Sequence, residues 1–251
     1  MKKTSKIISI ITVVKNDKDN INKTIKSIIT QKNNLIEYLV IDGGSNDGTL
    51  KEINKYKKTI DLIVSKKDKG IYYAMNKGIK LSKGQLIGFC NSGDIIYPGS
   101  LRKIIEKYSR EKFDLLFGTV KRNYTKGVLI KSGFNLKRIF YNFDFATSHS
   151  TGFYVKKQIH EEIGCYDTNF KISADYDLYL RIVKKNKYKI SSTPKKQLIG
   201  EMSSGGHSSK FSFFEHLNEE SRIRFKNKQN IIFIFVIYVN ATIKFLLKKF
   251  T

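Results

Sequence analysis

One aspartate lies where the sheet of an α/β protein would place chemistry. The apolar run Gln85–Cys90 predicts a buried strand, and Asn91-Ser-Gly breaks this run directly before Asp94. Open α/β sheets bind their ligands beyond the carboxyl ends of the strands. A carboxylate there is a hard oxygen ligand that suits Mg²⁺ or Mn²⁺ carrying a phosphorylated substrate. The alternative is a turn aspartate that caps the helix expected near Pro98.

Two further acidic turns follow predicted strands. Asp42 ends the strand Leu35–Ile41, at an edge where a carboxylate can accept a hydrogen bond from a nucleobase N–H. Asp68 and Lys69 lie in the polar loop after the strand Ile60–Ser65. The alternatives are that Asp42 stabilises its own glycine-rich turn, and that Asp68 and Lys69 form an ordinary exposed pair.

The second half of the chain adds one aspartate and two histidines. Asp175 opens the helical stretch Tyr176–Val183, where the helix dipole favours an ionised carboxylate, and simple capping is the alternative. His149 precedes a short predicted strand, and a lone histidine there is as well explained by a structural role. His207, in a Gly- and Ser-rich loop, would reach a metal or a diphosphate when the loop closes, or else stay exposed to solvent.

Strands and helices alternate along the part of the chain that must position these residues. Strands at 7–14, 35–41, 60–65 and 85–90, with helices such as Ile71–Leu81 between them, predict βαβ units. After Asp94 the pattern loosens into a helix around Leu101–Tyr108 and short strands, with Phe113–Val120 and Val128–Lys131 as a candidate hairpin. We expect an α/β fold: a Rossmann-like, mostly parallel sheet flanked by helices, with a mixed layer after it.

The composition is that of a folded, strongly basic protein. Of 251 residues, 40% are hydrophobic, and 47 Lys and Arg against 22 Asp and Glu give a net charge of +25. The lysines are spread along the chain without a clustered stripe, so we expect no nucleic-acid partner. Cys90 and Cys165 predict neither a disulfide framework nor a zinc site. Because no cleavage site follows the apolar Ile7–Val14, we expect a first core strand and a cytoplasmic protein.

The C-terminal stretch differs in kind. A spanning helix needs ~20 mostly apolar residues, and Asn240 and Lys244 interrupt the run that starts at Ile231. A basic helix lying in a membrane interface is the favoured interpretation, with Lys244, Lys248 and Lys249 facing anionic headgroups. The alternative is a terminal helix docked on the protein's own core.

Four motifs, taken in order, resemble those of the family 2 glycosyltransferases. The resemblance covers about residues 7–185. It implies the GT-A fold, a nucleotide-sugar donor and inversion at the anomeric carbon. The motifs are Ile10-Ile-Thr-Val-Val-Lys-Asn16, Val40-Ile-Asp-Gly-Gly-Ser-Asn-Asp-Gly-Thr49, Asp68-Lys-Gly-Ile-Tyr-Tyr-Ala-Met-Asn-Lys-Gly78 and Asn91-Ser-Gly-Asp94.

The resemblance implies a donor site along the sheet edge. Asp42 would contact the nucleobase, usually uracil, beside the backbone from Thr12 to Val14. The loop of Asp68 would lie along the ribose and the donor sugar, with Lys69 offsetting diphosphate charge. Many relatives carry an acidic residue where Tyr73 stands, which leaves the preferred donor sugar open.

It also implies roles at the reacting centre. Asp94 matches the last carboxylate of the family's Asp-X-Asp signature, and because Asn91-Ser-Gly precedes it the first carboxylate is missing. Asp94 would then bind Mn²⁺ or Mg²⁺ weakly, together with the donor, beside Asn91. Asp175 matches the aspartate of the family's Glu-Asp motif and would be the catalytic base, although Ala174 replaces the glutamate. His149 resembles a position on the acceptor side.

These expectations combine into one hypothesis. It is an inverting hexosyltransferase that moves a sugar, from UDP in particular, to a glycan or lipid-linked acceptor in bacterial surface polysaccharide synthesis. Residues 1–210 would form the GT-A domain, with a nucleotide-binding half (1–97) and an acceptor-binding half (98–210). Residues 211–251 would form a helical tail, and 230–251 would hold the protein at the inner face of the plasma membrane. The alternatives are a non-catalytic sugar-nucleotide binder, a nucleotidyltransferase-like enzyme or a basic nucleic-acid-binding protein.

Overall fold

The main layer of the molecule is a seven-stranded, mostly parallel sheet. The computed structural model describes residues 5–124, 127–135 and 150–247. β1 pairs in parallel with β2 and β4, and β9 is antiparallel to its neighbours β4 and β6. The expected α/β fold is confirmed. In sheet order the strands are β10 (Ile190–Ser192), β6 (Leu115–Phe117), β9 (Phe153–Lys156), β4 (Leu86–Phe89), β1 (Ile8–Val14), β2 (Ile36–Asp42) and β3 (Leu62–Ser65).

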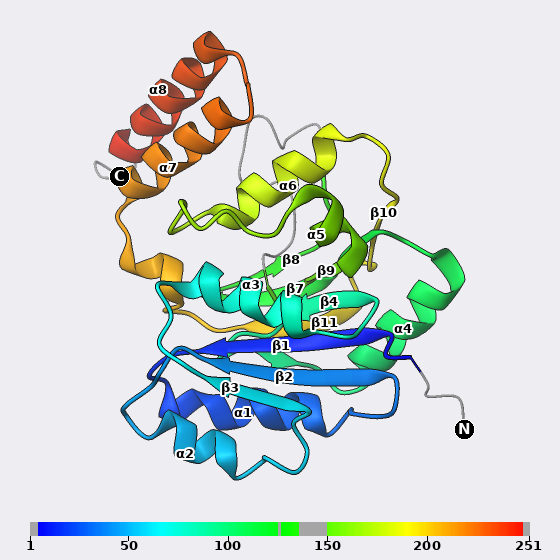
Figure 1. Cartoon of the computed structure of the whole chain (residues 1–251). Helices are drawn as coiled ribbons and strands as arrows, with labels where there is room; N and C mark the ends of the chain where they lie inside the picture. Colours follow the sequence, from blue (N-terminus) through cyan, green and yellow to red (C-terminus); the bar gives the residue numbers. More distant parts are fainter. Residues whose placement is uncertain (1–4, 125–126, 136–149, 248–251) are drawn as a thin grey trace.

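Helices cover both faces of this sheet (Figure 1). Every residue of β1 and β2 is buried, as expected for parallel strands covered on two sides. Successive β1 side chains join different cores, because neighbouring residues of a strand point to opposite faces. One face is covered by α1 (Lys18–Ile29), α2 (Thr49–Asn54) and α4 (Ser100–Glu111), and the other by α3 (Ile71–Leu81), α5 (Lys157–Ile163) and α6 (Ala174–Lys184).

A second, four-stranded sheet is built from strands that lie between residues 95 and 202. The expected strand Phe113–Val120 is wrong as a single element: the chain leaves the large sheet after β6 and enters the small one as β7. The change of sheet falls at Gly118, where an added Cβ would lie 2.0 Å from the Ile199 side chain. β7 and β8 form the expected hairpin. In sheet order these strands are β5 (Ile95–Ile96), β11 (Leu198–Met202), β7 (Thr119–Tyr124) and β8 (Gly127–Lys131).

The chain ends in a helical hairpin that stands apart from the sheets, at the upper left of Figure 1. A short 3₁₀ turn, η3 (His207–Lys210), leads into α7 (Phe213–Lys226), which begins at a capping box, and α8 (Ile231–Leu247) follows. α7 contacts both α6 and α8. Among the described residues, no helix combines the length and apolar character needed to cross a membrane.

One face of α8 packs on α7 and the other is open. Phe245 stacks on Phe213 with ring centroids 4.1 Å apart, and the Tyr238 hydroxyl lies 3.0 Å from Asn218 Oδ1. The opposite face exposes large apolar side chains. They are Ile231, Ile232, Phe235, Val236, Val239, Ile243, Leu246 and Leu247.

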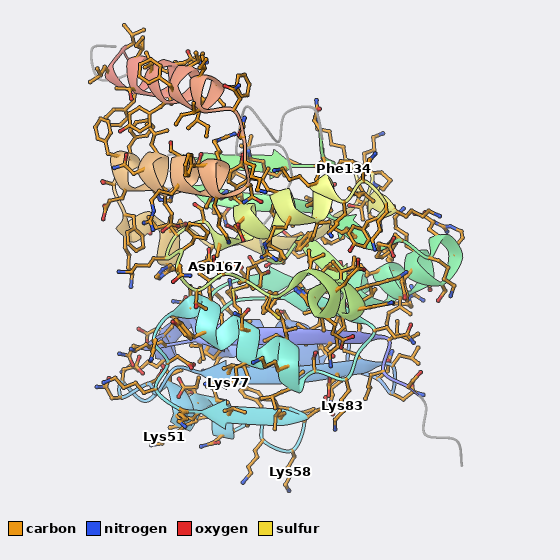
Figure 2. The ribbon with its side chains drawn as sticks, turned by 45° about the horizontal axis from the view of Figure 1, so that its top comes forward. Lys51, Lys58, Lys77, Lys83, Phe134 and Asp167 are labelled. Carbon is orange, nitrogen blue, oxygen red and sulfur yellow. The ribbon has the colours of Figure 1, made fainter. Side chains whose placement is uncertain are left out.

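Lysines are distributed widely over the surface. Lys51, Lys58, Lys77 and Lys83 lie at separate places around the first half of the chain (Figure 2). A charge spread in this way attracts anionic partners at long range without defining one binding stripe.

Candidate active site

The carboxyl edge of the large sheet gathers the acidic residues singled out from the sequence. In the β1–β2–β3 register, Val14 lies opposite Asp42, and Asp42 lies opposite Ser65. Asp68 follows β3, and Asn91 and Asp94 follow β4. Parallel strands that end together therefore bring these side chains to one edge.

Asp42 is fully buried and already bonded within the protein. Its carboxylate accepts hydrogen bonds from the Ser45 amide at 3.1 Å, from the Ser45 hydroxyl at 2.5 Å and from the Ser65 hydroxyl at 2.6 Å. The turn-stabilising alternative thus describes bonds that the structure contains. A nucleobase N–H that approached this carboxylate would have to share it with these three donors.

Thr12 and Val14 differ in what they offer to a ligand. The Thr12 side chain is buried inside the sheet, where its hydroxyl donates to the Cys90 carbonyl at 2.8 Å and lies 3.0 Å from the Tyr38 hydroxyl. The Val14 carbonyl accepts from the Gly43 amide at 2.9 Å, at the edge itself. A ligand would therefore meet the backbone near Val14 and not the Thr12 side chain.

Two buried acceptor atoms at this edge have no hydrogen-bond partner among the described residues. Asp68 pairs with Lys77 at 2.6 Å through Oδ1, not with the exposed Lys69, and its Oδ2 is one of these atoms. The Asn91 side-chain oxygen is the other. Buried acceptors ordinarily find a donor, so both would suit ligand hydroxyls.

Asp94 is buried and held by donors from two distant segments. Oδ1 accepts from the Ser203 amide at 3.0 Å, and Oδ2 accepts from the hydroxyls of Ser150 at 3.2 Å and Thr151 at 3.0 Å. Burial raises the pKa of the Asp94 carboxyl to about 6, and these hydrogen bonds oppose the rise. This aspartate thus joins the β4 edge to the strand β11, which the sequence did not predict.

Asp175 lies in the first turn of α6 and is buried. The N-cap residue of the helix is Ser173, so Asp175 is not the N-cap. The Tyr72 hydroxyl donates to the Ile172 carbonyl at 2.8 Å and ties this turn to α3. Burial, and then the charge of Asp175, raises the pKa of Tyr72 well above its usual value. A buried carboxylate at a helix start suits a general base.

One short segment contacts Asp94 and the loop that leads to Asp175. At one end the Ser203 amide donates to Asp94, and at the other His207 Nε2 lies 2.9 Å from the Lys171 carbonyl, four residues before Asp175. His207 is therefore engaged with the protein backbone, in a 3₁₀ turn and not in an open loop. His149 lies outside the described residues.

The described residues do not form a metal site on their own. No group of three or more His, Cys, Asp or Glu side chains that could hold a metal ion occurs among them. Asp94 would contribute a single carboxylate, and both of its oxygens already accept hydrogen bonds from the protein. A single carboxylate would hold a cation only together with the phosphates of a donor, and Mn²⁺ or Mg²⁺ stays a prediction.

Helix α7 supplies acidic residues that reasoning from the sequence missed. Glu219 is buried and accepts hydrogen bonds from the backbone just before Asp175, across 46 to 48 residues of sequence. Burial raises the pKa of Glu220 to about 7; Arg224 lowers it, and the charges of Asp175 and Glu219 raise it further. No local pattern reports such a contact, because the partners belong to different helices.

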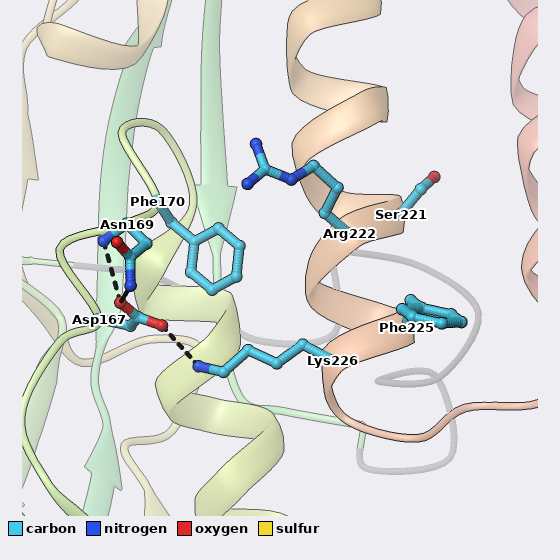
Figure 3. Close-up of a pocket in the computed structure, with 7 residues that line it drawn as sticks. All are labelled: Asp167, Asn169, Phe170, Ser221, Arg222, Phe225 and Lys226. Atoms are coloured by element: carbon cyan, nitrogen blue, oxygen red, sulfur yellow. Dashed lines mark hydrogen bonds and ion pairs between the residues drawn. The ribbon is translucent and has the colours of Figure 1, made fainter.

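The loop before Asp175 also faces α7 across a hollow of ≈ 540 Å³ (Figure 3). Lys226 Nζ donates to Asp167 at 2.6 Å across it. Phe170, Arg222 and Phe225 also line the hollow. Aromatic faces and a guanidinium are groups that bind sugar rings and phosphates.

The mostly parallel, helix-covered sheet has the architecture of the GT-A fold, which solved glycosyltransferase structures share. The sequence profile described as Glycosyl transferase family 2 matches residues 9–164. The chain belongs to that family.

Curated relatives and solved structures agree with this family. An uncharacterized glycosyltransferase of Mycobacterium tuberculosis is 30% identical over 182 residues, 69% of this chain and 68% of the relative. A PGL/p-HBAD biosynthesis glycosyltransferase of Mycobacterium bovis is 28% identical over 163 residues, 62% of this chain and 61% of the relative.

Two solved structures share the fold at low sequence identity. S. aureus TarS 1-349 in complex with UDP-GlcNAc superposes with a TM-score of 0.70 and 17% identity, over 95% of this chain and 73% of TarS. The mannosyltransferase PcManGT from Pyrobaculum calidifontis, in complex with GDP-Man and Mn²⁺, gives a TM-score of 0.63 and 13% identity, over 95% and 70%.

Proposed function

We propose that this glycosyltransferase is an inverting hexosyltransferase that uses a nucleotide diphosphate sugar, UDP-linked in particular, and a hydroxyl acceptor. The observation that carries the proposal is the buried carboxylate of Asp175, linked by one segment to the donor edge at Asp94. The nucleotide sugars bound to TarS and to PcManGT support a donor of this class.

The donor would lie along the carboxyl edge of the sheet. The base would approach Asp42 and the backbone near Val14. The unpartnered oxygens of Asp68 and Asn91 would accept hydrogen bonds from ribose and sugar hydroxyls. Lys69, which is exposed beside them, would offset diphosphate charge.

Transfer would be a single displacement. The acceptor oxygen attacks the anomeric carbon from the face opposite the diphosphate, while the bond from that carbon to the diphosphate oxygen breaks. The nucleoside diphosphate leaves with the electron pair, and Asp175 takes the acceptor proton. A divalent cation accompanying the donor would neutralise the leaving diphosphate, with Asp94 as its one protein carboxylate.

We place the acceptor on the α6–α7 side, with the lipid or glycan carrier at the membrane. The hollow beside Phe170 and Arg222 adjoins the loop that leads to Asp175. The exposed apolar face of α8 and the net charge of +25 match an anionic bilayer surface. An acceptor in surface polysaccharide synthesis fits this placement.

The decisive experiment measures binding and transfer separately. A thermal-shift panel of UDP- and GDP-sugars, with and without Mn²⁺, identifies the donor, because a ligand of the native state raises Tm. Asp175→Asn should keep this shift and lower transfer at least ~10²-fold, since it removes the proton acceptor. Undiminished turnover in Asp175→Asn would refute the base assignment, and donor binding without transfer by the wild type would indicate a non-catalytic binder.

A further inference from the structure

The backbone that precedes Asp175 converges on a single buried carboxylate from another helix. Glu219 accepts a hydrogen bond from the Lys171 amide at 2.8 Å through Oε2, and from the amides of Ile172 and Ser173 at 2.7 Å each through Oε1. Bonds to an ionised acceptor are about twice as strong as neutral ones. Three successive backbone N–H groups thus converge on one carboxylate, which the chain itself supplies.

The carbonyls of the same three residues are fastened as well. Lys171 O lies 2.9 Å from His207 Nε2, Ile172 O accepts from the Tyr72 hydroxyl at 2.8 Å, and Ser173 O accepts from the Tyr176 amide at 2.9 Å. The carbonyl contacts come from η3, from α3 and from α6 itself. Glu219 accepts from all three amides, which end at Ser173, the N-cap residue of α6.

We infer that Glu219 is a positioning residue for Asp175, so that α7 is a working part of the active site and not only of the tail. The inference rests on the proposed function. A reacting group displaced by about 1 Å can lose on the order of 10²-fold in rate. Releasing three amides at the turn that carries Asp175 would permit such a displacement.

A second acidic residue of α7, Glu220, also interacts electrostatically with Asp175. Its carboxyl lies close enough to Asp175 for the charge of that aspartate to contribute to its raised pKa. The same turn of α7 therefore presents two acidic side chains to the start of α6. Arg224, one turn later, lies over the Tyr176 ring at 5.1 Å and completes the contact between the two helices.

The test is Glu219→Gln, which preserves size but turns one oxygen into an N–H₂ group facing a backbone N–H. We expect kcat to fall 10- to 100-fold, the donor Kd to change less than twofold, and amide hydrogen exchange at residues 171–173 to accelerate. The matched control is Glu215→Gln, which removes an exposed acid one turn earlier on α7, in the capping box. It should leave kcat near the wild-type value. Glu219→Asp, which keeps the charge, should recover part of the rate.

The outcomes separate this inference from the proposed function. A folded Glu219→Gln variant with wild-type kcat overturns the inference, and so does an equal loss of kcat and donor affinity, which indicates a structural role. If Glu219→Gln does not fold, Glu219→Asp decides by the same two readouts. A wild-type protein that transfers no sugar would refute the proposed function. Amide hydrogen exchange at residues 171–173 would still report whether Glu219 holds these amides.

Discussion

The aspartates at the sheet edge already form hydrogen bonds within the protein. Asp42 and Asp94 are both buried, and their carboxylate oxygens accept hydrogen bonds from serine and threonine side chains. Such bonds hold the loops in place when no donor is bound. If a nucleotide sugar binds at these two residues as we propose, part of its gain would come from exchanging hydrogen bonds, which contributes less net free energy than adding them.

His160 predicts a pH dependence of stability. It is buried on α5, its two ring nitrogens have no hydrogen-bond partner among the described residues, and burial lowers its pKa to about 3, with Arg181 adding to the effect. The unfolded chain, with a pKa near 6.5, binds the proton more tightly. The contribution of neutral His160 to the free energy of unfolding is therefore fully present above about pH 6.5 and is lost as the pH falls toward 3. The loss amounts to about 2 kcal/mol at pH 5.

The measurement is urea unfolding of the wild type and His160→Phe between pH 4.5 and 8. Phe keeps the ring and removes the titrating group. The difference in free energy of unfolding, variant minus wild type, should become more positive as the pH falls from 8 to 4.5. Parallel stability curves for the two proteins would contradict the assignment.

Among the elements, α6 and α7 are joined by a second buried carboxylate. Asp177 is fully buried and accepts from Arg181 Nε at 2.8 Å and from Asn227 Nδ2 at 2.9 Å, while Lys226 Nζ lies 3.2 Å away. Asp177→Ala leaves the buried Asn227 amide and the partly buried Arg181 guanidinium without this partner. The free energy of unfolding should fall by about 3 kcal/mol.

Asp167 provides the matched control for that prediction. It also bonds Lys226, but its side chain is 20% exposed, whereas that of Asp177 is 0% exposed. Asp167→Ala should cost less than about 1 kcal/mol in the same urea titration. Equal losses in the two variants would show that burial of Asp177 does not decide its contribution.

Local patterning predicted the elements that are periodic and regular. The helix Ile71–Leu81 has the expected bounds, and β1 begins one residue later than expected, at Ile8, because continuous β-branched runs and one-sided apolar faces are local signals. The change of sheet at Gly118 is not local: it depends on Ile199, which β11 brings from far along the chain.

The same limit applies to the candidate site. Asp42, Asp94 and Asp175 were recognisable because each stands at the end of a strand or the start of a helix. The contacts that hold them were less recognisable, since Ser203, which donates to Asp94, and Glu219, which accepts from the backbone just before Asp175, come from segments distant in sequence. The metal, the donor and the acceptor remain predictions for the same reason.

At the scale of the whole molecule, the outer face of α8 predicts attachment to an anionic membrane. Replacing Ile232, Phe235 and Val239 by Ser removes three exposed apolar side chains, and the protein should then no longer sediment with anionic liposomes. The matched control replaces Val128 and Leu129 of β8, which are also exposed, and should sediment as the wild type does. Unchanged sedimentation of the α8 variant would refute the membrane contact.

The helical hairpin sets where the protein can be shortened. A chain cut after Lys210 would lack both Glu219 and the apolar helix α8. Loss of activity and loss of membrane attachment would then occur in the same variant and could not be assigned to separate causes. A chain cut after Gln229 keeps every contact that α7 makes with α6 and sheds α8 alone. Of the two truncations, only the second tests the candidate active site and the proposed membrane contact of α8 separately.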